Sequence, residues 1–169
     1  YLHDQIDRSR ANLGVETLDV YFVHNPETQL GEVDRPEFLT RLRAAFGALE
    51  EAVAAGSIAC YGTATWNGYR VDPGDPGYLS LAEVVAAAQD VGGSDHHFQV
   101  IQLPYNLGMS EAFTRANQHV KNRVVPVLEA ARELGIAVMA SASLHQGQDQ
   151  DLGAALLGGV HRAGGRHDG

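Results

Sequence analysis

Residues 18–26 read LDVYFVHNP, and this stretch decides the fold. It is an apolar run of β-branched and aromatic residues, which is typical of a buried strand, and its closing Asn-Pro ends the strand. Three more runs of this kind follow, at residues 58–63 (IACYGT), 98–103 (FQVIQL) and 136–140 (IAVMA). No tight hairpin turn follows any of the four runs, so their even spacing predicts parallel strands joined by long connections.

Helical patterns occupy the segments between these runs. Each shows apolar residues at helical spacing, a capping residue at its start or a glycine at its end. We expect an opening helix that ends at Gly14 with Leu2, Ile6 and Leu13 on its apolar face, a helix over residues 36–55, a helix that starts at the Ser80–Glu83 capping box, and a last helix over residues 122–134 that Lys121 enters.

Alternation of strand and helix at this spacing predicts an α/β protein of parallel βα units. A doubly wound open sheet and a (β/α)₈ barrel both fit the pattern. A doubly wound nucleotide-binding sheet usually has a glycine-rich turn after its first strand, whereas here no glycine follows His24 before Gly31. We therefore predict a partial (β/α)₈ TIM barrel, with parallel strands inside and helices outside. Four strands are about half of the eight that a barrel needs.

Composition limits the classes of partner. The chain has 169 residues, with 12 Lys+Arg against 21 Asp+Glu and a formal net charge of −9, which argues against nucleic acid. No apolar run is long enough for a membrane span, so we expect no membrane partner. One cysteine and the absence of a signal-like start indicate a cytoplasmic protein. Residues 1–147 are expected to form one unit, and the glycine-rich residues 148–169 an atypical, disordered tail.

Polar residues stand at or just beyond the ends of the predicted strands, where βα barrels carry their chemistry. These are His24, Thr65, Gln102 and Ser141. The plainer alternative is that such hydroxyls and amides only cap neighbouring helices. Residues 66–78 form a Pro/Gly-rich loop that we expect to be irregular and to offer aromatic walls. We predict no metal site, since the His-His pair at 96–97 is more typical of a solvated loop.

Four segments together resemble the aldo-keto reductase family. Residues 13–26 (LGVETLDVYFVHNP) resemble the segment that ends in that family's catalytic histidine, and residues 48–58 (ALEEAVAAGSI) are similar to its next helix. Residues 100–106 (VIQLPYN) resemble its sixth strand, and residues 134–144 (LGIAVMASASL) its seventh. The resemblance covers about residues 5–147 and corresponds to strands four to seven of the family's barrel.

The resemblance implies an NAD(P)H-dependent oxidoreductase that reduces aldehydes or ketones, with NADPH as the cofactor and NADH as the alternative. It implies that His24 is catalytic and points at the carbonyl oxygen of a small-molecule substrate, and that Gln102 binds the nicotinamide carboxamide. Thr65 stands at the family's Ser-Asn position and Ser141 at the position of its stacking tyrosine. We expect both in the cofactor site, although a serine cannot stack.

The family's catalytic aspartate, tyrosine and lysine belong to strands that would precede Tyr1, and Lys121 is not at a strand end. We therefore expect this chain to be inactive on its own. Two alternatives stay open: a non-catalytic barrel remnant or interaction module, whose open sheet edges invite self-association, and a small α/β binding module unrelated to reductases.

Overall fold

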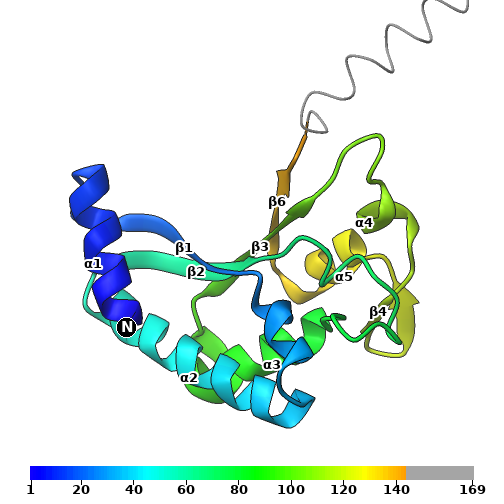
Figure 1. Cartoon of the computed structure of the whole chain (residues 1–169), viewed down its shortest axis with the longest axis horizontal. Coiled ribbons are helices and arrows are strands. Elements are labelled where there is room, and N and C mark those ends of the chain that lie inside the picture. The colour runs from blue at the N-terminus through cyan, green and yellow to red at the C-terminus, as the bar shows by residue number, and fades with distance from the viewer. Residues whose placement is uncertain (144–169) are drawn as a thin grey trace, which may run out of the picture.

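A parallel four-stranded sheet organises the computed structural model, in which residues 1–143 are described (Figure 1). Its order is β1-β2-β3-β6, and every neighbouring pair is parallel. The strands are β1 (Leu18–His24), β2 (Ile58–Ala64), β3 (Phe98–Pro104) and β6 (Ala137–Ser141). The four predicted strands are therefore confirmed, with ends that differ by one residue at most.

The helices begin and end where local sequence signals place them. The Asp34 side chain accepts the N–H of Glu37 at the start of the second helix, and the Ser80 hydroxyl accepts the N–H of Glu83 at the start of the third. Gly14 ends the first helix in the left-handed conformation. The main helices are α1 (Leu2–Leu13), α2 (Arg35–Ala54), α3 (Leu81–Gly92) and α5 (Val127–Leu134); the short ones are η1 (Pro26–Gly31), η2 (Gly93–Asp95) and α4 (Glu111–Thr114).

The hydrophobic core lies between the sheet and the helices that follow its strands (Figure 1). Phe46 of α2 packs on Tyr61 of β2 and Phe98 of β3, with ring centroids 5.1 and 5.4 Å away. Ile101 and Leu103 of β3 are fully buried in the same core. Burial of these large apolar side chains is what holds the helices against one face of the sheet.

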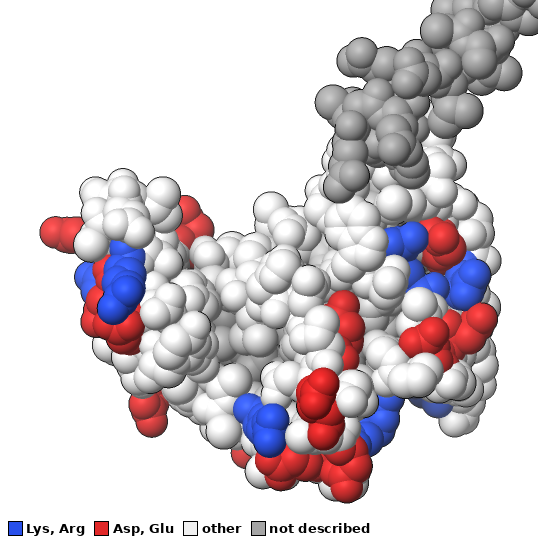
Figure 2. All heavy atoms as spheres, viewed as in Figure 1, with Lys and Arg blue, Asp and Glu red and all other residues white. Residues whose placement is uncertain are grey.

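The opposite face of the sheet, which we call the open face, carries the alternate residues of each strand. Its rows include Phe22, Gly62 and Val100, one on each of three neighbouring strands. Figure 2 shows a hollow between α1 and β6 that is nearly free of charged side chains. A pocket of about 370 Å³ on this side is lined mainly by apolar residues, among them Phe22, Leu13 and Met139, together with Thr17 and Asp19. Helices on one face and an apolar hollow on the other are the arrangement of a partial (β/α)₈ barrel.

The expected helix over residues 122–134 is wrong in its first turn. Residues 118–125 form a hairpin of β4 (Gln118–Val120) and β5 (Arg123–Val125), and only residues 127–134 are helical. Lys121 therefore enters a hairpin turn, with a φ of 54°, and not a helix. The physical reason is that valines on both sides of the turn favour strands, while Pro126 keeps the residue before it out of helical geometry.

Leu13 is the other local correction. Its side chain is 68% exposed, whereas Ile6 on the same helix is buried as predicted. Leu13 is the last residue of α1, and it lines the hollow. The predicted tail, residues 148–169, and the predicted boundary at residue 147 lie outside the described residues. Among the described residues, no helix is both long and apolar enough to cross a membrane.

Candidate functional site

His24 and Gln102 lie in one row across the sheet. The register joins His24 to Ala64, Ala64 to Gln102 and Gln102 to Met139, and residues in register on parallel strands point to the same face. The side chain of His24 is exposed and that of Gln102 is half-buried. Two strand spacings separate their backbones, about 10 Å. The sheet therefore brings both residues to its open face, with only the small Ala64 between them.

The backbone turns sharply at the end of β1. Asn25 adopts the left-handed conformation with a φ of 46°, which asparagine tolerates better than most residues. Its N–H donates to the carbonyl oxygen of Ala64, 2.6 Å away. Pro26 then opens η1. This turn makes His24 the last residue of its strand and leaves its imidazole at the rim.

Thr65 lies beside Gln102, but its hydroxyl is covered. The N–H of Thr65 donates to the carbonyl oxygen of Gln102 at 2.9 Å. Its side chain is only 5% exposed, and within the described residues Oγ1 is buried without a hydrogen-bond partner. The backbone of Thr65 thus connects the end of β2 to β3. Its hydroxyl makes no hydrogen bond within the described residues.

Ser141 completes the set at the end of β6. It pairs with Pro104, and its carbonyl oxygen accepts the N–H of Tyr105 at 3.1 Å. Ser141 is two residues beyond Met139 and therefore faces the same side of the sheet. All four residues predicted for the site accordingly lie at the carboxyl ends of the four parallel strands.

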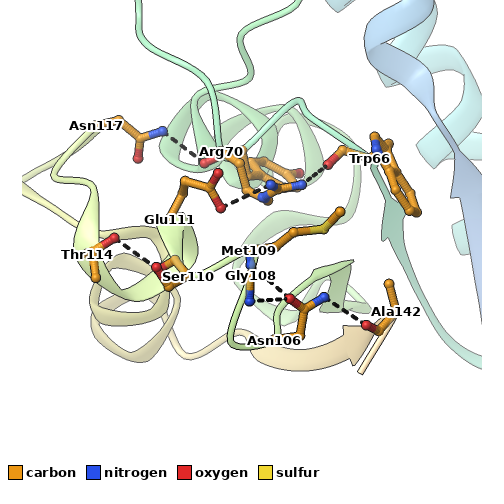
Figure 3. Close-up of polar contacts among 11 residues, drawn as sticks. Trp66, Arg70, Asn106, Gly108, Met109, Ser110, Glu111, Thr114, Asn117 and Ala142 are labelled. Atoms are coloured by element: carbon orange, nitrogen blue, oxygen red, sulfur yellow. Dashed lines mark hydrogen bonds and ion pairs between the residues drawn. The ribbon is translucent and has the colours of Figure 1, made fainter. Parts of the chain in front are cut away.

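The loops beyond these strands are tied together by polar contacts that the sequence did not reveal (Figure 3). The guanidinium of Arg70, a residue that is only 8% exposed, donates to the carbonyl oxygen of Trp66 and to the Glu111 carboxylate, both at 3.0 Å. Burial raises the pKa of Glu111, but hydrogen bonds from its own backbone N–H and from Arg70 outweigh it, so the net pKa is lowered. Asn106 donates to the carbonyl oxygen of Ala142 at 2.8 Å, which joins the loop after β3 to the end of β6.

Two buried amides at β4, which we call the amide clamp, hold the loop between β2 and α3. Asn117 donates to the carbonyl oxygens of Tyr69 and Val71 at 2.9 and 2.7 Å. Gln118 accepts the N–H of Leu81 at 2.8 Å and donates to the carbonyl oxygen of Leu79 at 3.1 Å. The loop is irregular, as predicted, yet its backbone is fixed. No signal in the sequence marks this clamp, because its partners lie 37 or more residues away.

The prediction of aromatic walls holds only for Trp66, which is 41% exposed. Tyr69 and Tyr78 are buried, and the Tyr69 hydroxyl lies 2.7 Å from the Thr63 hydroxyl. Burial raises the pKa of both phenols, so neither is suited to give up a proton. Among residues 1–143, no group of three or more His, Cys, Asp or Glu side chains could hold a metal ion.

Comparisons with known proteins agree with this architecture. The model of the aldo/keto reductase family matches residues 1–151, and the chain belongs to this family. An aldo/keto reductase from Klebsiella pneumoniae, solved in complex with NADP and acetate, has a similar fold, with a TM-score of 0.55 and 21% sequence identity. The match covers 86% of this chain but 38% of that one. Among curated proteins, none is significantly similar to this chain.

Proposed function

We propose that this chain provides part of an NAD(P)H-dependent site that reduces a small aldehyde or ketone, and that His24 and Gln102 belong to this part. The observation that supports it is the row of His24, Ala64 and Gln102 on the open face of a sheet from an oxidoreductase family. The Klebsiella protein with the similar fold binds NADP. NADPH is the proposed cofactor, and NADH is the alternative.

The residues at the strand ends fit a nicotinamide. A side-chain amide offers one acceptor and two donors, which is the complement of a carboxamide. Gln102 is half-buried, and among the described residues its amide has no hydrogen-bond partner, so this capacity is available on the open face. Ser141 lies at the same edge, at the end of β6, and Thr65 lies beside Gln102 at the end of β2. Both are proposed members of the cofactor site. When bound, a reduced nicotinamide supplies the hydride to the carbonyl carbon.

His24 is the proposed catalytic residue. Its exposed imidazole at the rim can donate a hydrogen bond to a carbonyl oxygen, and that bond strengthens as negative charge develops on the oxygen. Lys121, the only lysine of the chain, lies at the hairpin turn with its Nζ 3.5 Å from Glu133, so it does not activate a general acid here. We therefore expect no turnover by this chain alone.

A nuclear magnetic resonance titration of the chain with NADP⁺ tests the proposal. We expect no saturation in the micromolar range but weak binding with a Kd of about 1–10 mM, since part of a site supplies only part of the binding energy. The shifted signals should be those of His24, Gln102, Thr65 and Ser141. Gln102→Ala should abolish the shifts, whereas the matched control Gln99→Ala, an exposed glutamine at the other end of β3, should leave them unchanged.

Two results would contradict the proposal. Shifts confined to another part of the chain would place the cofactor elsewhere, and an unchanged spectrum at about 10 mM NADP⁺ would mean that the row has no affinity for it. Saturable binding in the micromolar range would instead refute the expectation that the site is only partly built in this chain.

Self-association is a second candidate property, and the sheet edges support it. Within the described residues, β1 pairs only with β2, and β6 pairs only with β3. Unpaired strand edges beside an apolar hollow are templates for a second copy. Sedimentation velocity over a hundredfold range of concentration should show a mass that rises above that of one chain. A constant mass of one chain would remove this candidate.

A further inference from the structure

A second pocket lies beyond the carboxyl ends of β1 and β2, between η1 and the loop after β2. It has a volume of about 340 Å³ and is distinct from the apolar hollow of the open face. Asn25, Glu27, Trp66 and Asp75 are among the residues that line it, and none of the described residues that line it is a lysine or arginine. Two carboxylates, neutral polar groups and one indole therefore surround it.

Glu27 is the unusual member of this pocket. The residue is buried, with an exposed fraction of only 8%. Oε1 accepts the N–H groups of Trp66 and Gly68 at 3.2 and 3.3 Å, which ties η1 to the loop. Oε2 is buried and has no hydrogen-bond partner among the described residues. A buried carboxylate oxygen without a donor is costly, so its presence points to a donor that comes from outside the chain.

The loop is built to pass closely over this carboxylate. A Cβ at Gly68 would lie 2.9 Å from Cδ1 of Leu79 and 3.3 Å from the carboxyl carbon of Glu27. A side chain at position 68 would therefore press against both Leu79 and Glu27. In Figure 3 the indole ring of Trp66 points away from the Arg70–Glu111 pair, so the guanidinium does not occupy its face.

We propose that this pocket binds the ammonium group of a small organic molecule. An ammonium group brings three hydrogen-bond donors, and one of them would satisfy Oε2 of Glu27 once the atoms that cover this oxygen shift aside. Its positive charge complements Glu27 and Asp75, and an indole face attracts cations. Because Asn25 directly follows His24, the ammonium would be the remote end of an amine-bearing carbonyl substrate. Only this last step rests on the proposed function.

Trp66 is the only tryptophan of the chain, so the tryptophan fluorescence reports on the surroundings of this pocket residue. The probes are butylammonium, butanol and butyrate, which share an alkyl chain and differ in their polar end. We expect a saturable fluorescence change with butylammonium at a Kd of about 1–10 mM, and binding at least about tenfold weaker for the other two. No cofactor is present, so failure here is separate from failure of the proposed reduction.

Glu27→Gln is the decisive variant. A glutamine oxygen can still accept the Trp66 and Gly68 N–H groups, while its NH₂ replaces the free acceptor with a donor. We expect the affinity for butylammonium to fall about tenfold or more. Glu32→Gln is the matched control, because Glu32 is exposed, ends the same turn and does not line the pocket, and its affinity should be unchanged. Asp75→Asn, at an exposed position, should weaken binding without endangering the fold.

The proposal is overturned if butanol or butyrate binds as tightly as butylammonium, if no probe changes the Trp66 signal, or if Glu27→Gln binds like the wild type. Circular dichroism shows whether each variant is folded. If Glu27→Gln does not fold, the decision passes to Asp75→Asn, and undiminished affinity in that variant contradicts the proposal.

Discussion

Gly62 on β2 is a position where the addition of one methyl group should lower the stability of the fold strongly. The register between β2 and β3 shifts between Tyr61 and Gly62, and there the two strands approach unusually closely. A Cβ at Gly62 would overlap the carbonyl oxygen of Val100 and lie 2.9 Å from Cγ1 of the same residue. Since the first contact is with backbone, no rotamer change relieves it, and Gly62→Ala must push the two strands apart.

The size of the effect follows from what such a shift breaks. Overpacking a core typically costs about 1–3 kcal/mol. Loss of a buried backbone hydrogen bond, such as that from Tyr61 N–H to the carbonyl oxygen of His97, adds about 1 kcal/mol. We expect Gly62→Ala to lower the free energy of unfolding by about 3 kcal/mol. With a urea m-value of about 2 kcal/mol/M, the midpoint falls by about 1.5 M.

Gly47→Ala is the matched control for this experiment. Gly47 lies inside α2, and a Cβ there would meet nothing within 4 Å. The same substitution should therefore stabilise the chain by about 0.5–1 kcal/mol through helix propensity. Urea unfolding followed by circular dichroism measures both variants. Equal stability of Gly62→Ala and the wild type would refute the strand contact, and destabilisation by Gly47→Ala would refute the contrast between the two glycines.

Three further predictions concern the polar contacts. Burial raises the pKa of Glu50, but hydrogen bonds from His97 and the Tyr61 hydroxyl outweigh it and leave the pKa lowered. The ionised Glu50 should therefore contribute fully to the free energy of unfolding at pH 7, and this contribution should be lost as the pH falls below about 5. In urea titrations at several pH values, the stability of Glu50→Gln should depend less on pH in this range than that of the wild type. Gln118→Leu should lower the free energy of unfolding by about 3 kcal/mol in the same assay, because the N–H of Leu81 and the carbonyl oxygen of Leu79 lose their hydrogen-bond partner. A loss below about 1 kcal/mol would mean that the amide clamp contributes little to stability. Arg70→Ala leaves Glu111 half-buried without its partner and should cost about 3 kcal/mol, whereas the exposed control Arg8→Ala should cost less than about 0.5 kcal/mol.

The strands could be predicted from sequence because each is a short run of β-branched, aromatic and other apolar residues. The end of β1 was predictable too, because Pro26 cannot extend the strand. The hairpin at β4 and β5 was missed, since Val124, Val127 and Leu128 also match helical spacing and its turn contains no glycine. The positive φ of Lys121 depends on the surrounding fold and not on the residue type.

The candidate site also contains both residues that the sequence predicted and residues that it did not. His24, Gln102 and Ser141 could be predicted as candidates because polar residues that end apolar strands can be recognised in the sequence. Glu27 and Arg70 were missed, because a glutamate after a proline and an arginine in a Pro/Gly-rich loop look like surface residues. Their burial arises from contacts with residues about 40 positions away in the chain.

A crystal structure of this chain grown with NADP⁺ tests the central claim most directly. We expect the nicotinamide on the open face, with its carboxamide in hydrogen-bond contact with Gln102 and the His24 imidazole at the same rim. A nicotinamide bound against the helices, or His24 and Gln102 on opposite faces of the sheet, would contradict it.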